Sequence, residues 1–573
     1  MKKAPSSPRI RLIAIGLIAF ALVLVGRLYF LQIIHGQTLA EKADHQYVRS
    51  DTNLFDRGSI FLQDKDGRLI AGATIKSGFT ISIDPSKVLD AEATYTAVNM
   101  LLPIDHDAFM LHAVKKDDPY EEIAKRVPEN TAKSIEALKL PGVSIYKEQW
   151  RFYPGGELAA QTLGFVGYDD SGIKLSGSYG LERFYENILA RDEGSIYINF
   201  FAEVFTSLGK TLFSDENKMS GDVVTTIEPS VQLFLDHELK KITDTWSSAR
   251  SGGIVIDPKT GEIYAMALYP SFDTNNFSVI KDPVVFSNQL VEGVYEMGSI
   301  VKPLTMAAGL DAGVVTATST YDDKGFLELN GSKFSNFDGK GRGVVPMQEV
   351  LNQSLNTGAA FVESQLGNKR FAQYMEKYGL GEETGIDLPS EAHGLIDNLK
   401  SPRDLEYATA SFGQGIAMTP IEMVRAASVL ANGGVLITPH LVKTIRYDTG
   451  ISKTVTYNDG NRVLKPETSE EITRMLVQVV DKALAGGTVK IPRYSVAAKT
   501  GTAQIAKEGA RGYYDDRYLH SFFGYFPAYN PRFLVFLYTV DPKGVNFASQ
   551  TLTAPFMETT KFLIDYYDIP PDR

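Results

Sequence analysis

An apolar run near the N-terminus constrains this chain more than any other feature. Residues 12–26 are apolar, Arg27 interrupts them, and the run resumes from Leu28 to Ile34. As a helix, this segment spans roughly 34 Å at about 1.5 Å per residue, slightly more than the ~30 Å hydrocarbon core of a bilayer. We therefore expect a single transmembrane helix over residues 12–34.

Basic residues indicate how this helix is oriented. Lys2, Lys3, Arg9 and Arg11 precede it, which predicts a cytoplasmic tail over residues 1–11 and a chain that is otherwise outside the cell membrane, in the periplasm or on the outer face. A cleaved signal peptide is the competing interpretation, but the run is long and no clear small-x-small cleavage site follows it. Arg27 either extends to the headgroups or contacts another membrane protein.

Composition excludes several classes of protein. The net charge of −11 makes nucleic acid an unlikely partner, because an acidic surface repels phosphates. Cysteine is absent, which rules out disulfides, thiolate metal sites and cysteine nucleophiles. The 573 residues leave room for two to four domains.

Residues 35–225 have a mixed pattern without an evident catalytic constellation, so we expect a non-catalytic spacer domain there. Gly58 to Ala71 is typical of a hairpin that turns at Asp64–Gly67. Ala91 to Leu138 favours helices, interrupted at its prolines. Gly164 to Gly180 is rich in glycine and polar residues, which predicts a loop.

Residues 226–573 are expected to form a second, α+β domain. Two apolar strands precede a helical block that runs from Val301 to about Asn432, and three strands follow it. This order predicts one antiparallel sheet, assembled from both ends of the domain and covered by helices. The strands are expected at Gly253–Ile256, Glu262–Ala267, Tyr494–Ala506, His520–Phe526 and Arg532–Val540.

The segment Gly298-Ser299-Ile300-Val301-Lys302-Pro303 contains a candidate nucleophile and its base. Residues three apart are neighbours on a helix, and proline is tolerated only in the first turn, so Ser299 should lie near a helix N-terminus. A serine hydroxyl needs a base to become nucleophilic. Lys302 serves as that base only if burial or a nearby cation lowers its pKa.

Two further segments supply candidate partners. Ser354-Leu355-Asn356 lies between two predicted helices, and side chains two residues apart reach one site only from a turn. There Ser354 is a candidate for passing a proton, and Asn356 for holding Lys302 and binding a substrate amide. Each segment taken alone is also typical of an ordinary structural element.

The last candidate segment is Lys499-Thr500-Gly501-Thr502, within a predicted strand. Gly501 permits close approach of a substrate backbone. Lys499 supplies a cation for a carboxylate and lowers the pKa of Lys302, while Thr500 and Thr502 supply hydroxyls. The backbone N–H groups of Ser299 and Thr502 are the candidate oxyanion hole.

Together, in this order, the three segments resemble the signature of penicillin-binding proteins and serine β-lactamases. Further segments resemble the pedestal, or dimerisation-type, domain of class B penicillin-binding proteins, which β-lactamases lack. These segments are Arg57–Ile60, Asp66–Ala71, Arg151–Pro154 and Gly180–Glu182, while Phe412–Gly415 with Thr419-Pro420 resembles a segment beside the active site. Leu355 stands where β-lactamases usually carry aspartate, which weakens the β-lactamase alternative.

The resemblance implies a D,D-transpeptidase that cross-links peptidoglycan stem peptides. Ser299 attacks the D-Ala-D-Ala donor, and β-lactams acylate the same serine. It also implies a multi-pass glycan polymerase of the SEDS family as membrane partner, and septal division is favoured over elongation. No metal or cofactor is expected. The alternatives are a D,D-carboxypeptidase or β-lactamase-like hydrolase, and a β-lactam sensor or scaffold without turnover.

Overall fold

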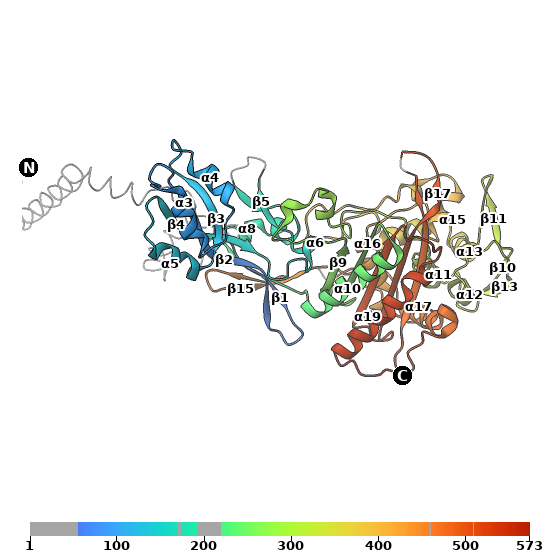
Figure 1. The fold of residues 1–573 in the computed structure, drawn as a ribbon. Coiled ribbons are helices and arrows are strands. Elements are labelled where there is room, and N and C mark those ends of the chain that lie inside the picture. Colours follow the sequence, from blue (N-terminus) through green and yellow to red (C-terminus); the bar gives the residue numbers. More distant parts are fainter. Residues whose placement is uncertain (1–54, 170–173, 192–218, 458–459, 508) are drawn as a thin grey trace, which may run out of the picture. The chain divides into compact units, whose positions relative to one another are not determined.

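The computed structural model describes residues 55–169, 174–191, 219–457, 460–507 and 509–573. The predicted tail, the transmembrane segment 12–34 and Arg27 lie outside the described residues. Within the described ranges, no helix is long and apolar enough to cross a membrane. The chain divides into two compact units, of which one contains Ser77–Gln149 and the other Asp56–Lys76 with Trp150–Arg573 (Figure 1).

The smaller unit packs short helices on strands. Its buried residues include Ile81, Val98 and Ile135 in one cluster, and Ile83 with Phe109 in another. Its elements are α3 (Ala91–Asn99), α4 (His106–Ala113), β3 (Glu121–Val127), α5 (Glu129–Ala137) and the adjoining parts of β2 (Leu69–Ile83) and β4 (Val143–Phe152).

Strand β3 corrects the expectation of a largely helical segment from Ala91 to Leu138. β3 pairs antiparallel with β2, from Phe79 opposite Val127 to Ile83 opposite Glu121. The sequence Glu-Glu-Ile-Ala-Lys-Arg-Val has no strong strand pattern of its own. The partner strand, distant in sequence, determines its conformation.

The larger unit contains a sheet in the order β15-β14-β7-β1-β2. The hairpin predicted at Gly58–Ala71 is confirmed, since β1 pairs with β2 from Gln63 opposite Leu69, and Gly67 in the turn has a positive φ of 81°. Residues 164–180, expected as a loop, contain a short hairpin of β5 and β6. The bounds are β1 (Ile60–Gln63), β5 (Val166–Tyr168), β6 (Leu175–Gly177), β7 (Gly221–Thr225), β14 (Val442–Tyr447) and β15 (Ser452–Thr454), with helices α6 (Ala160–Leu163), α7 (Gly180–Phe184) and α8 (Glu186–Leu189).

Three of the N-terminal segments that carry the family resemblance meet in one buried ion cluster. Glu182 is fully buried, and its carboxylate accepts from Arg57 Nε at 2.7 Å and from Arg151 Nε at 2.6 Å. The Tyr153 hydroxyl donates to the same carboxylate at 3.2 Å. Glu182 pairs with arginines from two other segments, so the cluster links these segments to one another.

The second sheet of this unit confirms the prediction of one antiparallel sheet built from both ends of the domain. Its order is β16-β17-β18-β8-β9, so the two strands that precede the helical block pair with the three that follow it. β16 lies at the sheet's edge. The strands are β8 (Arg250–Ile256), β9 (Ile263–Tyr269), β16 (Ala497–Ala506), β17 (Tyr513–Phe526) and β18 (Phe533–Val540).

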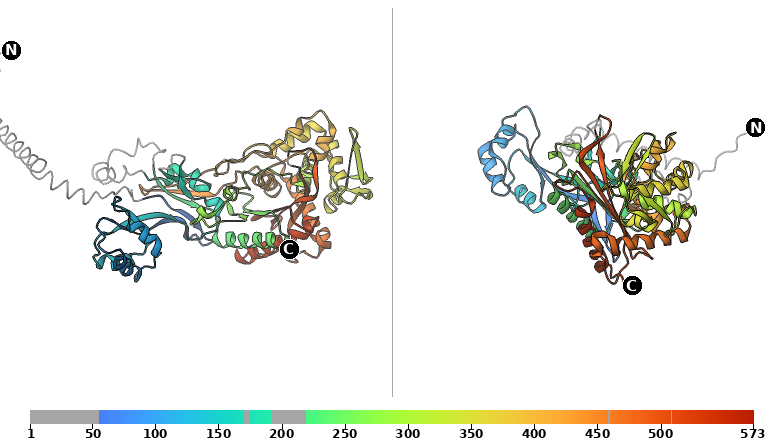
Figure 2. Two further views of the ribbon diagram at one scale, coloured as in Figure 1. Left: turned by 45° about the horizontal axis from the view of Figure 1, so that its top comes forward. Right: turned by 90° about the vertical axis from the view of Figure 1, so that its right-hand side faces the viewer.

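Helices cover both faces of this sheet (Figure 1 and Figure 2). Side chains alternate across a strand, so Phe522 packs in one apolar cluster with α10 (Pro229–Trp246) and α19 (Thr553–Tyr566), whereas Phe523 packs in the other. The second cluster also contains residues of α11 (Lys302–Asp311), α16 (Pro420–Ala431) and α17 (Pro466–Gln478). The remaining helices are α12 (Met347–Asn352), α13 (Asn356–Leu366), α14 (Asn368–Lys377), α15 (Asp404–Ala410) and α18 (Ala548–Thr551).

The predicted helical block also contains four strands that were not expected. They form two hairpin-like pairs, and Asn330-Gly331 between β11 and β12 has positive φ at both residues. That dipeptide is a recognised hairpin signal, so the sequence did contain evidence for this turn. The strands are β10 (Thr320–Asp323), β11 (Phe326–Leu329), β12 (Ser332–Ser335) and β13 (Gly343–Pro346).

Candidate active site

Ser299 lies in a single 3-10 turn, Gly298–Ile300, immediately before α11. Lys302 is the first residue of α11 and Pro303 the second, which agrees with the expectation that proline marks the start of this helix. Ser299 is half-buried, whereas Lys302 is 1% exposed. The candidate base is therefore removed from solvent, and the candidate nucleophile is not.

Glycines allow the Ser299 segment to press against strand β16. A Cβ atom on Gly501 would lie 2.6 Å from the Met297 carbonyl oxygen and 2.4 Å from Ser521 Oγ. Gly298 has a positive φ of 61°, and a Cβ there would lie 2.6 Å from the Thr502 carbonyl oxygen. The space that a Gly501 side chain would fill is thus occupied by protein, so this glycine serves to position the Ser299 segment. Its role in substrate approach stays a prediction.

The loop around Gly413 holds the other side of the same turn. Gly298 N–H donates to the Gly413 carbonyl at 3.1 Å, and a Cβ on Gly413 would lie 2.2 Å from the Gly298 carbonyl oxygen. The segment Phe412–Gly415 therefore lies beside Ser299, as the family resemblance implies. Thr419, by contrast, serves as the N-cap of α16 in a capping box with Glu422.

Ser354 brings the two lysines together. Lys302 Nζ donates to the Ser354 carbonyl at 2.5 Å and to its hydroxyl at 3.2 Å, and Lys499 Nζ donates to the same hydroxyl at 3.0 Å. Ser354 has a positive φ of 56°, an uncommon conformation for a residue with a side chain. The three segments singled out in the sequence thus converge at one hydroxyl oxygen.

Neither lysine forms an ion pair within the described part of the chain, and both are buried, Lys302 at 1% exposure and Lys499 at 3%. Burial, reinforced by the charge of Lys499, lowers the pKa of Lys302 well below its ordinary value. Burial lowers the pKa of Lys499 to about 7. Burial and the neighbouring cation both disfavour the charged form of Lys302, so the site favours its neutral amine.

The residues beside Ser354 differ in their roles. Leu355 is fully buried in the core, which explains why an apolar residue stands in the middle of this segment. Asn356 begins α13, and its Nδ2 donates to the Ser335 carbonyl at 2.8 Å. The contact expected between Asn356 and Lys302 is absent from the hydrogen bonds of the described residues.

A buried polar cluster, not foreseen from the sequence, supports the start of α13. Asp323, 2% exposed, accepts from the Asn336 amide at 3.0 Å and from the Thr357 hydroxyl at 2.7 Å. Asn336 in turn accepts from the Thr357 N–H. Asp323 lies in β10, Asn336 in a loop and Thr357 in α13, so no local spacing identified them.

Strand alternation separates the remaining predicted residues. Lys499 and Gly501 share the face of β16 that meets Ser354 and Met297, whereas Thr500 and Thr502 alternate with them. Thr502 Oγ1 accepts the N–H of Ala548 at 3.1 Å. This contact with Ala548, 46 positions away in the chain, could not be read from the sequence.

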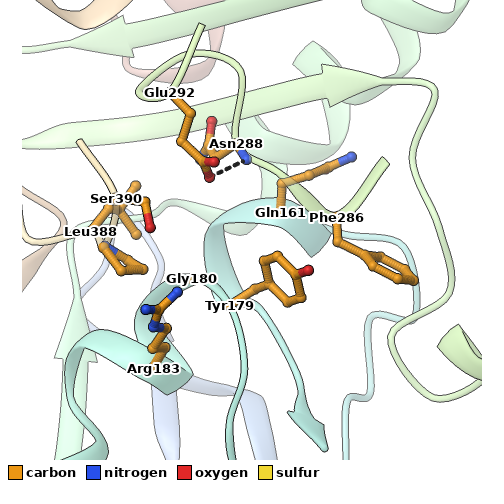
Figure 3. A pocket seen from close by; sticks show the side chains of 10 residues that line it. Gln161, Tyr179, Gly180, Arg183, Phe286, Asn288, Glu292, Leu388 and Ser390 are labelled. Carbon is orange, nitrogen blue, oxygen red and sulfur yellow. Dashed lines mark hydrogen bonds between the residues drawn. The ribbon is translucent and has the colours of Figure 1, made fainter. Parts of the chain in front are cut away.

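A small pocket lies elsewhere in the larger unit. Figure 3 shows Arg183 and Ser390 at this pocket, with Glu292 beside Asn288. The backbone N–H of Asn288 donates to the Glu292 carboxylate at 3.0 Å. The cavity measures about 30 Å³, room for a water molecule or two and not for a peptide. It contains none of the converging residues. Within the described ranges, no group of three His, Asp or Glu side chains is arranged to hold a metal ion.

Two protein-family models match this sequence. The penicillin binding protein transpeptidase domain matches residues 252–560, and the penicillin-binding protein dimerisation domain matches residues 54–204. The Stage V sporulation protein D of Bacillus subtilis is 30% identical over 561 residues, or 95% of this chain and 83% of that protein. The peptidoglycan D,D-transpeptidase FtsI of Escherichia coli is 28% identical over 556 residues, or 94% and 88% of the two chains.

Solved structures share the fold. Penicillin binding protein 2X from Streptococcus thermophilus superposes with a TM-score of 0.71 at 20% identity, covering 89% of this chain and 79% of that one. Penicillin binding protein 3 from Mycobacterium tuberculosis, complexed with aztreonam, superposes with a TM-score of 0.66 at 22% identity, covering 91% and 98%.

Proposed function

This chain belongs to the penicillin-binding proteins that carry a transpeptidase domain, and on that premise we propose that it cross-links peptidoglycan stem peptides through an acyl-enzyme on Ser299. The observation that carries the proposal is the meeting of Lys302 and Lys499 at the Ser354 hydroxyl, beside the turn that bears Ser299. Relatives named peptidoglycan D,D-transpeptidases support the same substrate class.

Lys302 is the proposed general base for acylation. A neutral amine has two N–H bonds and one lone pair, and both N–H bonds are directed to Ser354. The lone pair is then left to take the Ser299 proton as Ser299 Oγ attacks the penultimate D-alanine carbonyl. The hydrogen bond between Ser299 and Lys302 is not present among the described residues, and we expect it to form as the substrate binds.

Ser354 is the proposed route of the proton to the leaving group. Its hydroxyl oxygen accepts from both lysines, so its own O–H is free to donate to the departing amine. Collapse of the tetrahedral intermediate breaks the C–N bond, and the terminal D-alanine leaves with that proton. The N–H groups of Ser299 and Thr502 are the proposed oxyanion hole.

The second half-reaction transfers the acyl group to an amine of a neighbouring stem peptide. The amine attacks the Ser299 ester, its proton passes back through Ser354 and Lys302, and Ser299 regains its hydroxyl. A D,D-carboxypeptidase or β-lactamase would instead need a base that activates water. Within the described ranges, no carboxylate pairs with either lysine, which favours transfer to an amine over hydrolysis.

Further parts of the proposal concern the cell. We propose that residues 12–34 anchor the chain in the cell membrane, that its enzymatic part lies outside, and that β-lactams acylate Ser299. A SEDS-family glycan polymerase is the proposed membrane partner, with Arg27 at their interface and septal division as the setting. The match to the penicillin-binding-protein family models and the aztreonam complex of a protein with this fold support β-lactam acylation. The membrane anchor and the polymerase partner rest on the sequence alone, and co-purification of the full chain with and without Arg27→Leu tests the partnership.

The direct test replaces the nucleophile. We expect Ser299→Ala to abolish labelling by a fluorescent penicillin, while thermal unfolding of the protein stays close to that of the unsubstituted chain. Intact mass after incubation with penicillin should show one long-lived adduct on the unsubstituted chain. Labelling that persists in Ser299→Ala would refute the nucleophile assignment, and rapid loss of the adduct would favour a hydrolase.

A further inference from the structure

The hydroxyl of Thr502 is oriented by a segment that the sequence motif does not include. Ala548 N–H donates to Thr502 Oγ1 at 3.1 Å, and within the described ranges this is the only hydrogen bond of that hydroxyl. A hydroxyl has one O–H and two lone pairs. Because Ala548 uses a lone pair, the O–H is left to donate, and its direction is restricted by the Ala548 bond.

His520 and Thr551 hold Ala548 in place. His520 is fully buried in β17, directly opposite Thr502 in the sheet register. Its Nδ1 lies 2.9 Å from the Thr551 hydroxyl, and that hydroxyl donates to the Ala548 carbonyl at 3.3 Å. A short chain of hydrogen bonds therefore leads from His520 through Thr551 to Ala548 and on to Thr502.

The protonation state of His520 suits this arrangement. Burial lowers the pKa of His520 to about 4, although a hydrogen bond to the backbone of Asn546 acts to raise that pKa. The imidazole is therefore neutral at pH 7 and has one ring N–H. Since the Thr551 hydroxyl donates to Ala548, it can accept that N–H from Nδ1.

Lys499 alone does not satisfy the hydrogen-bonding capacity of a substrate carboxylate at this edge of the site. Lys499 is 3% exposed, and its Nζ already donates to the Ser354 hydroxyl and, at 3.0 Å, to the Thr500 carbonyl. A donor peptide ends in a free carboxylate, and hydrogen bonds to a charged acceptor are the strong ones. The Thr502 hydroxyl lies on the edge strand and has its O–H left to donate, so it can supply that second hydrogen bond.

We propose that His520 and Thr551 are positioning residues, which hold Ala548 so that its N–H turns the Thr502 hydroxyl into a dedicated donor to the terminal carboxylate of the donor substrate. This inference deepens the proposed transpeptidase function and rests on it. Neither residue touches the substrate. Their effect reaches the reaction only through Ala548 and Thr502.

The test compares benzylpenicillin with its methyl ester, which lacks the carboxylate charge. For each variant, the measured quantity is the ratio of the two second-order acylation rate constants. Thr551→Val keeps the side-chain shape and removes the hydroxyl, and we expect it to lower the carboxylate-to-ester ratio about tenfold, the effect of one charged hydrogen bond. Thr551→Ser should restore the ratio, and His520→Phe should lower it as Thr551→Val does.

Thr559→Val is the matched control. Thr559 is equally buried at 1% exposure, and its hydroxyl donates to the Pro555 carbonyl within α19, so the ratio should stay unchanged. If both compounds slow by the same factor in Thr551→Val and His520→Phe, the roles are merely structural and the proposal is overturned. If the unsubstituted chain is acylated by neither compound, the proposed function itself fails.

Discussion

Adding one methyl group at Gly501 tests how tightly the reaction depends on the packing of Ser299 against β16. In Gly501→Ala, the new Cβ would lie 2.6 Å from the Met297 carbonyl oxygen, where about 3.4 Å is an ordinary contact. The backbone two residues before Ser299 must therefore shift by roughly 0.8 Å, and a misplacement of about 1 Å costs on the order of 100-fold in rate. Overpacking should also lower the free energy of unfolding by about 1–3 kcal/mol.

Gly253→Ala separates this local effect from a general loss of stability. A Cβ on Gly253, in β8 of the same sheet, would lie 2.9 Å from Leu537 and 3.0 Å from Leu235, among residues remote from Ser299 in the fold. The assay measures the rate constant for acylation by fluorescent penicillin together with thermal unfolding. We expect both variants to lose stability and only Gly501→Ala to lose rate. Equal losses of rate in the two variants, or wild-type acylation by Gly501→Ala, would refute the argument.

Two further predictions address the lysine pair and the buried ion cluster. Lys499→Met removes the cation that helps to lower the pKa of Lys302, so we expect that pKa to rise. Less of the neutral amine is then present at a given pH, and the acidic limb of the pH–acylation profile should move to higher pH. An unmoved limb would count against Lys302 as the base. Glu182→Gln leaves the buried Arg151 without its carboxylate and Arg57 with only Glu186 as ion-pair partner. It should lower the free energy of unfolding by about 3–5 kcal/mol in denaturant titrations, while the folded fraction still acylates.

Several features could be predicted because they depend on local pattern. Pro303 marked the start of the helix that bears Lys302, and the apolar strands before and after the helical block predicted the five-stranded sheet. Strand β3 could not be predicted, because Glu121–Val127 has no periodicity of its own. The Asn330-Gly331 hairpin had a local signal that the surrounding helical pattern outweighed.

The chemistry of the site was also partly readable in advance. Residue types limit what a segment can do: a serine three residues before a lysine at a helix start, together with the two later segments in their order, predicts a nucleophile and a base. The family resemblance identified Phe412–Gly415 as a neighbour of Ser299, which the Gly413 contact confirms. The role of Gly501 in packing against Met297 and the hydrogen bond from Asn356 to Ser335 were not readable.

The sequence by itself determined the chemical groups, their order along the chain, and the helix or strand that bears most of them, because those properties follow from residue type and short-range spacing. Tertiary structure alone decided which groups meet. Lys499 and Ser354 are 145 positions apart, and Thr502 and Ala548 are 46 apart. Contacts at such separations depend on how two sheet faces pack against their helices, and this packing also excludes water from the lysines and so lowers their pKa values.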